Sequence, residues 1–120
     1  MKTIGIVGTR SRDNSRAMKK VKNAFFKVYE EGDRICSGGC PKGGDRFAEV
    51  FHKNFSIPIL IFPANWTKFG KGAGFVRNTD IARESDILIA CVSKSRTGGT
   101  EDTIEKFLKD HSKDALVLVE

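Results

Sequence analysis

Long apolar runs are missing from this sequence, whereas a membrane-spanning helix needs about 20 consecutive, mostly apolar residues. The first strand-like stretch is too short for the apolar core of a signal peptide, and no small-residue cleavage site follows it. We therefore expect a cytoplasmic protein with no membrane partner. The 120 residues, 39% of them hydrophobic, are enough for one domain over residues 1–120 with a single core.

Cysteine is scarce as well, with only three residues, which is an odd number. Cys36 and Cys91 fall in apolar segments, where a thiol behaves as a small hydrophobic group. Cys36 and Cys40 are not spaced like a usual zinc-binding pair, and no second pair exists. We therefore expect no metal site and no cofactor, and thiols that stay reduced in a cytosolic protein.

Acidic residues are outnumbered, with 15 Asp and Glu against 21 Lys and Arg, for a net charge of +6. This excess favours an anionic partner. The sequence lacks the interleaved aromatic and basic residues that stack single-stranded bases. A small anionic ligand is therefore favoured over nucleic acid, which stays as a less favoured alternative.

Strand-like and helix-like segments alternate along the chain. Strands are expected over residues 3–7, 33–37, 57–62, 85–92 and 115–119, and helices over 15–31, 46–54, 73–84 and 100–111. Gly32 is expected to end the first helix, and residues 63–72 form the longest irregular segment. Continuous apolar strands between amphipathic helices predict an α/β fold: a single doubly wound, Rossmann-like domain with a five-stranded, mainly parallel sheet.

Three glycine-rich turns each follow an expected strand, at residues 8–10, 37–46 and 97–100. In a parallel sheet all three turns lie at the carboxyl edge, where ligands of such folds bind. Glycine lets backbone N–H groups approach an anion closely, and a helix N-terminus adds partial positive charge. The three turns together predict a site for a phosphorylated ligand such as a nucleotide.

Neither of the first two turns completes a standard phosphate motif. The first lacks the third glycine of the dinucleotide fingerprint, and Gly44-Asp45 stands where a Walker A loop requires Lys-Ser or Lys-Thr. Asp45 either caps the next helix or binds a ribose hydroxyl or an amine, and Thr100 is expected to cap the last helix. The expected ligand-binding residues are Gly8, Thr9, Arg10, Ser37, Gly38, Gly39, Asp45, Asn78, Gly98, Gly99 and Thr100.

The segment of residues 63–78 mixes the only tryptophan with lysines, glycines and then Arg77-Asn78. Trp66 either pins this segment to the body of the protein or stacks on a base, and pinning is favoured because packed loops often bury tryptophan. Arg77 is either a solvated arginine or, if its helix crosses the strand ends, points with Asn78 into the crevice.

These motifs together resemble the SLOG superfamily, named for the Smf/DprA and LOG proteins, and within it the small YspA/YpsA-related branch. The matching segments, which run over nearly the whole chain, are residues 5–10, 37–45, 62–66, 70–74, 77–78 and 98–100. The resemblance implies a Rossmann-like sheet that binds nucleotides or nucleotide-derived ligands. The superfamily includes phosphoribohydrolases, DNA-processing proteins, molybdenum-cofactor carrier-like proteins and nucleotide-sensing domains.

The hydrolase branch uses an arginine and a glutamate near a Pro-Gly-Gly-x-Gly-Thr-x-x-Glu motif. Arg77 matches the arginine, but Thr97 replaces the proline and no glycine stands two places after Gly99. The glutamate falls at Glu105 by ungapped counting, and Glu101 is the nearer acid, although acids also suit a helix start. We therefore favour a nucleotide-binding sensor or carrier, expected to be a homo-oligomer. The alternative is an N-glycosidic hydrolase of nucleoside monophosphates, with Arg77, Glu101 and Glu105 as its catalytic residues.

Overall fold

Five parallel strands form one sheet in the order β3-β2-β1-β4-β5 in the computed structural model, which describes all 120 residues. The central strand β1 pairs on both sides, so that Ile4 faces Ile35 of β2 and Ile87 of β4. The strands are β1 (Thr3–Gly8), β2 (Arg34–Ser37), β3 (Ile59–Ile61), β4 (Ile87–Cys91) and β5 (Leu116–Val119). The predicted α/β class and five-stranded parallel sheet are confirmed.

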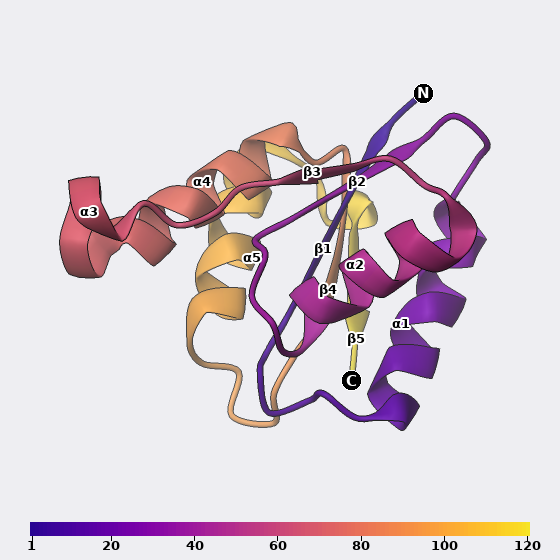
Figure 1. Cartoon of the computed structure of the whole chain (residues 1–120), viewed down its shortest axis with the longest axis horizontal. Coiled ribbons are helices and arrows are strands. Elements are labelled where there is room, and N and C mark those ends of the chain that lie inside the picture. Colours follow the sequence, from indigo (N-terminus) through magenta and orange to yellow (C-terminus); the bar gives the residue numbers. More distant parts are fainter.

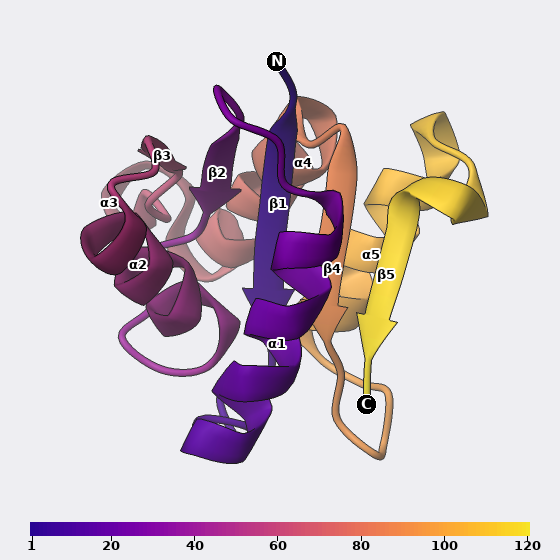
Figure 2. The same cartoon turned by 90° about the vertical axis from the view of Figure 1, so that its right-hand side faces the viewer.

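Helices cover both faces of the sheet (Figures 1 and 2). On one face lie α1 (Ser15–Val28) and α2 (Gly44–Phe55), and on the other lie α4 (Ala73–Glu84) and α5 (Gly99–Asp110). The short helix α3 (Trp66–Phe69), a 3-10 turn (Gly70–Gly72) and the first turn of α4 extend sideways beyond the sheet (Figure 1). No helix has both the length and the apolar character needed to cross a membrane.

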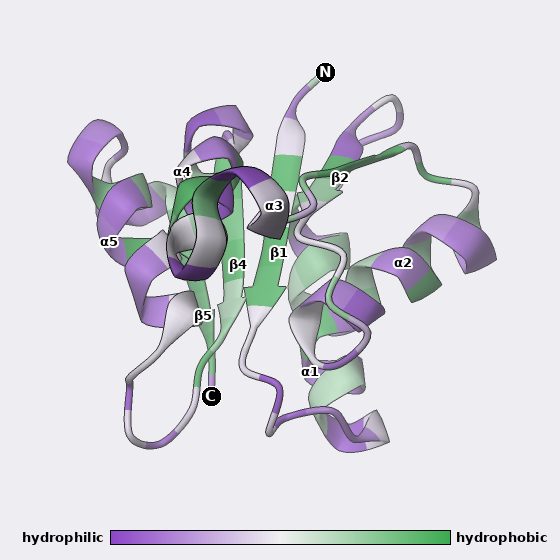
Figure 3. Cartoon of the chain, turned by 60° about the vertical axis from the view of Figure 1, so that its left-hand side comes forward, coloured by the Kyte–Doolittle hydropathy of each residue, from purple (hydrophilic) through white to green (hydrophobic).

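Each face of the sheet has its own apolar core, because successive strand residues point to opposite faces. Ile4 and Ile6 of β1 are fully buried under α1 and α2, against Phe25 and Phe51. The next residue, Val7, belongs to the second core with Phe107 of α5. The strands are apolar along most of their length, while the helices alternate apolar and polar stripes (Figure 3). Cys36 and Cys91 are fully buried, as expected of small hydrophobic residues.

The chain changes direction across the sheet between β1 and β4. From β1 it builds outward through β2 to the edge strand β3, and then returns to place β4 on the other side of β1. The loops that follow β1 and β4 consequently lead to helices on opposite faces. A crevice opens at such a switch point, beyond the carboxyl ends of the strands, and ligands of open α/β sheets bind there.

The first helix ends at Val28, three residues earlier than expected, and Gly32 does not stop it. Gly32 instead has φ +95° in the turn before β2. The buried carboxylate of Asp33 builds this turn, because it accepts hydrogen bonds from the Lys2 backbone at 2.8 Å, the Lys2 ammonium at 2.6 Å and the Glu30 backbone at 2.9 Å. A side-chain anchor therefore overrides the helix signal that continued to residue 31.

Two other expectations need correction. The third strand covers only Ile59–Ile61, because Pro58 has no N–H to donate to the sheet and uses only its carbonyl, which accepts from Ile35 at 2.9 Å. Residues 63–72 are not irregular throughout, because the Asn65 side chain accepts from the Lys68 backbone at 3.0 Å and caps α3.

Candidate functional site

A cleft of about 430 Å³ opens at the switch point, where the loops after β1 and β4 meet α4 and α5. We call it the switch-point cleft. The expected site residues that line it are Gly8, Thr9, Arg10, Asp45, Arg77, Asn78, Gly98, Gly99 and Thr100. Those that do not are Ser37, Gly38, Gly39, Glu101 and Glu105. The first and third glycine turns thus meet in one cleft, whereas the second contributes only Cys40 and Asp45.

The start of α5 opens into this cleft. Its N-cap is Gly98, with φ +95°, and no side chain caps the helix. Thr100 was expected to be the cap, but it lies inside the first turn. The first N–H groups of an α-helix have no partner within the helix, and they carry the positive end of its dipole. Because Gly98, Gly99 and Thr100 line the cleft, these N–H groups lie at its wall.

The start of α2 has a similar glycine cap but is already occupied. Its N-cap Gly43, with φ +74°, donates its N–H to the carboxylate of Asp13 at 2.7 Å. Arg46 donates to the same carboxylate oxygen at 2.8 Å. These two bonds, that from Arg46 foremost, hold the pKa of Asp13 below its usual range. A Cβ on Gly44 would collide with the backbone of Gly8, so the helix packs directly on the end of β1.

Asp45 does not cap α2, in contrast to one of the two roles expected of it. It lies one residue inside the helix, and one carboxylate oxygen reaches back to the N–H of Cys40 at 3.0 Å. The other oxygen lies 2.8 Å from the hydroxyl oxygen of Ser37, which is itself fully buried and 2.8 Å from the carbonyl oxygen of Ile6. The glycine-rich loop after β2 therefore already surrounds one anionic group, the carboxylate of Asp45.

Gly38 and Gly39 are needed for the conformation and packing of the loop itself. The buried Gly38 uses its carbonyl oxygen to accept from Nη1 of Arg77 at 2.9 Å, and a Cβ there would collide with Arg77 and Asp45. Gly39 has φ +79°, a conformation that favours glycine. Ser37, Gly38 and Gly39 thus shape the wall behind the switch-point cleft without lining it.

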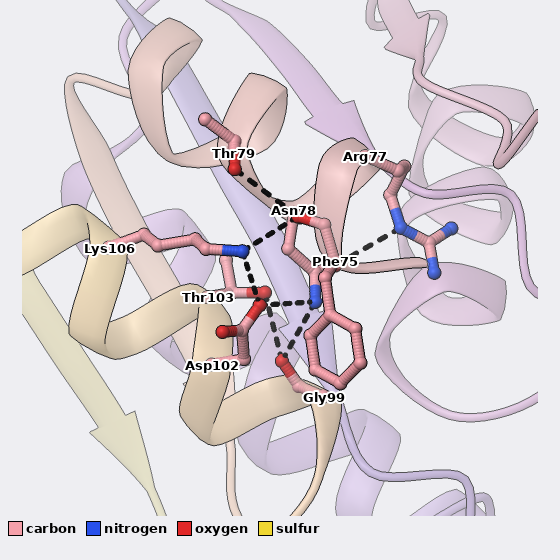
Figure 4. Close-up of polar contacts among 8 residues, drawn as sticks. All are labelled: Phe75, Arg77, Asn78, Thr79, Gly99, Asp102, Thr103 and Lys106. Atoms are coloured by element: carbon pink, nitrogen blue, oxygen red, sulfur yellow. Dashed lines mark hydrogen bonds and ion pairs between the residues drawn. The ribbon is translucent and has the colours of Figure 1, made fainter. Parts of the chain in front are cut away.

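Arg77 and Asn78 on α4 both line the cleft. Figure 4 shows the hydrogen bond between them and the contacts of Asn78 with α5. Arg77 donates from Nε to the side-chain oxygen of Asn78 at 3.1 Å and from Nη1 to Gly38. Its remaining terminal nitrogen, Nη2, has no hydrogen-bond partner. Asn78 is buried and donates from its amide nitrogen to the carbonyl of Gly99 at 3.2 Å and to Asp102 at 3.1 Å. The guanidinium is therefore pre-oriented with donor capacity to spare.

An ion pair behind the cleft continues this network (Figure 4). Nζ of Lys106 donates to the Asp102 carboxylate at 2.8 Å and to the carbonyl of Phe75 at 2.7 Å. The hydroxyl of Thr103 donates a hydrogen bond to the Gly99 carbonyl at 3.0 Å. Together these contacts fix the start of α5 against α4.

The two glutamates assigned to a possible hydrolase do not line the switch-point cleft. Glu101 pairs with Arg96 at 2.8 Å, and this hydrogen bond raises the pKa of Arg96. Glu105 is exposed on the outer side of α5. The acid that does line the cleft is Asp45, whose oxygens already have the partners described above.

Several lining residues were not among the expected site residues. Lys71 and Phe75 belong to the projecting segment before and within α4, which the fold brings over the strand ends. Trp66 was expected to be pinned and buried, but 59% of it is exposed, at the cleft. The mixed basic and aromatic segment directly before Arg77 was the sequence signal that could have placed these residues at the site.

The chain matches no known family model, no curated protein and no solved structure.

Proposed function

We propose that this chain binds a nucleotide or a nucleotide-derived phosphorylated ligand in the switch-point cleft. The observation that carries the proposal is the uncapped start of α5, whose first residues line a cleft that Arg77 also lines. The helix dipole and a guanidinium with an unused nitrogen are suited to one phosphate group. Arg10 and Lys71 add two more cations at the same cleft, and neither has a hydrogen-bonded acid.

The size and the apolar part of the cleft support a ligand larger than phosphate. A volume of about 430 Å³ falls within the range typical of small-molecule sites. Trp66 and Phe75 line the cleft while 59% and 56% of their surfaces are exposed. Exposed aromatic rings beside a phosphate subsite are suited to stack on a base. A sensor or carrier of such a ligand remains the function that we favour.

Calorimetry with AMP, GMP, CMP, UMP and IMP, each beside its nucleoside, tests the proposal. We expect at least one nucleotide to bind. Arg77→Ala should weaken the binding of that nucleotide by about 1.5–3 kcal/mol and leave the binding of its nucleoside unchanged. Arg83→Ala is the matched control, since Arg83 lies on the same helix, outside the cleft, and is largely exposed. Failure of all five nucleotides, and of dinucleotides and cyclic nucleotides, would overturn the proposal.

The alternative of an N-glycosidic hydrolase has less support. An acid that stabilises an oxocarbenium-like transition state must lie beside the scissile bond. Glu101 is engaged by Arg96, and neither Glu101 nor Glu105 lines the cleft. We expect little or no base release from the five monophosphates by chromatography. Rapid multiple turnover that disappears in Glu101→Ala or Glu105→Ala would instead establish the hydrolase.

Membership of the SLOG superfamily, a cytoplasmic location and a homo-oligomeric state also belong to this proposal. The three free cysteines support a reducing compartment. Light scattering coupled to size-exclusion chromatography measures the oligomeric state directly.

A further inference from the structure

A second cleft, of about 890 Å³, lies on the other side of the same two loops. It is formed by the start of α1, the loop after β4 and Glu120, which directly follows β5. Its lining contains five basic side chains, Arg12, Arg16, Lys20, Lys94 and Arg96, and one acidic residue, Glu120. We call it the basic cleft. Nearly a quarter of the basic residues of the chain therefore gather around one cavity, whereas the sequence alone spreads them over residues 12–96.

Arg96 already pairs with Glu101 at 2.8 Å, whereas none of the other four cations makes a salt bridge. Arg12 donates from Nη1 to the carbonyls of Val92 and Val119, at 3.2 Å each, which leaves its other nitrogens available. Lys20 contacts the carbonyl of Glu120 at 3.0 Å. Arg16 and Lys94 are exposed and have neither a salt bridge nor a hydrogen bond. Like charges brought this close repel one another, and a bound anion would offset that repulsion.

The remaining lining narrows the ligand chemistry. No aromatic side chain lines the basic cleft, so a base has no ring to stack on. Ser11, Ser93 and Ser95 supply hydroxyl groups, which donate hydrogen bonds to phosphate oxygens as well as to other acceptors. Several cations with hydroxyl donors, spread over a wide cavity, are suited to an extended anion of high charge.

We propose that the basic cleft binds a chain of two or more phosphates, whether free polyphosphate or the phosphate tail of a nucleotide. This site goes beyond the nucleotide site in the switch-point cleft. Thr9 and Arg10 line the first cleft, whereas Ser11 and Arg12 line the second. The loop after β4 is divided in the same way, with Thr97 in the first cleft and residues 93–96 in the second. The two loops therefore form a wall between two sites.

Calorimetry with inorganic tripolyphosphate tests this proposal. The double variant Arg16→Ala/Lys94→Ala removes two exposed cations without breaking a hydrogen bond, and we expect its affinity to fall at least about tenfold. Lys27→Ala/Lys53→Ala is the matched control, because both lysines are exposed in the last turns of α1 and α2, at the opposite edge of the sheet. It changes the net charge equally, so the difference between the two variants excludes a general charge effect.

The other ligands and variants separate the outcomes. If ATP and tripolyphosphate bind with equal affinity, the phosphate chain alone is the ligand. If ATP binds more tightly and competes with tripolyphosphate, the ligand is the phosphate tail of a nucleotide. Either result supports the proposal if Arg16→Ala/Lys94→Ala weakens the binding. The proposal is overturned if Arg77→Ala, and not the double variant, removes tripolyphosphate binding. It is also overturned if duplex DNA binds while tripolyphosphate does not. AMP binding that persists in the double variant keeps the two sites distinguishable.

Discussion

The side-chain amide of Asn78 donates a hydrogen bond to the carbonyl oxygen of Gly99, with 3.2 Å between the nitrogen and the oxygen. The bond joins α4 to the first residue of α5. The side-chain oxygen of the same Asn78 accepts from Arg77 at 3.1 Å. One buried amide therefore sets the distance between the guanidinium and the helix start, the two groups to which we assign the phosphate.

Replacing Asn78 tests this coupling. Asn78→Ala removes a buried hydrogen-bond donor from Gly99 and Asp102, and we expect the free energy of unfolding to fall by about 1–3 kcal/mol. Nucleotide affinity should fall with it, because Arg77 loses an orienting partner. Urea denaturation and calorimetry measure the two effects. Thr79→Ala is the control on the same helix, since the Thr79 hydroxyl bonds only within α4. Unchanged stability and affinity in Asn78→Ala would refute the role of this amide.

Gly44 is expected to be intolerant of even one methyl group. A Cβ there would collide with the backbone of Val7 and Gly8, neither of which can move without shifting β1. Because overpacking typically costs about 1–3 kcal/mol and backbone yields poorly, we expect Gly44→Ala to lower stability by at least about 2 kcal/mol. In Gly72→Ala the added Cβ meets nothing within 4 Å, and φ is −81°, so stability should stay equal or rise slightly. Thermal unfolding compares the two variants, and equal melting temperatures would contradict this packing.

The Asp33 carboxylate predicts a dependence of stability on pH. Burial raises the pKa of this group, but hydrogen bonds from Lys2 and Glu30 outweigh burial and the pKa in the folded protein is lowered. A lowered folded-state pKa contributes stability above the unfolded value of about 3.9, and this contribution is lost as the pH falls through the folded value. At pH 7 we expect Asp33→Asn to lower the free energy of unfolding by about 1.5–3 kcal/mol.

The difference in unfolding free energy between the original protein and Asp33→Asn should shrink steadily below about pH 4. Urea titrations at pH 7, 5, 4 and 3 measure it. Asp114→Asn is the control, because Asp114 is exposed and makes no ion pair. A difference that stays constant down to pH 3 would show that the charge of Asp33 is not what stabilises the turn.

The three thiols should differ in reactivity. Burial raises the pKa of Cys36 to about 11, and burial also raises the pKa of Cys91. At pH 8 a thiol with the pKa of Cys36 is ionised in only about one molecule in a thousand, and the thiolate is the reactive form. Cys40 is half-buried and lines the switch-point cleft. We expect an aromatic disulfide reagent to modify Cys40 first, and a bound nucleotide to slow that reaction.

Cys40→Ser provides the control for this measurement and should remove the fast phase of the absorbance change. A nucleotide that binds by calorimetry without protecting Cys40 would place the ligand elsewhere. Fast modification of all three thiols in the native protein would contradict the burial of Cys36 and Cys91.

The sequence by itself determined the order and type of the strands and long helices, and the sheet edge that holds the cleft. Apolar runs such as residues 3–7 and 87–91 are local signals that neighbouring residues cannot reverse, because a strand buried on both faces must be apolar throughout. The order of alternating elements then requires parallel strands, whose carboxyl ends share one edge. This is why Gly8 and Gly98 could be assigned to one site although 90 residues separate them.

Only the tertiary structure decided which glycine turn stays open. The loop after β2 and the loop after β4 look equally able to receive an anion in the sequence. Asp45 and Asp13 already supply carboxylates to the first, whereas the start of α5 has no capping side chain. Glu101 is likewise engaged by a partner, because it accepts a hydrogen bond from Arg96 and does not line the cleft. The choice depends on side chains that meet only after folding: partners such as Asp13, 30 residues from Gly43, leave no local trace in the sequence.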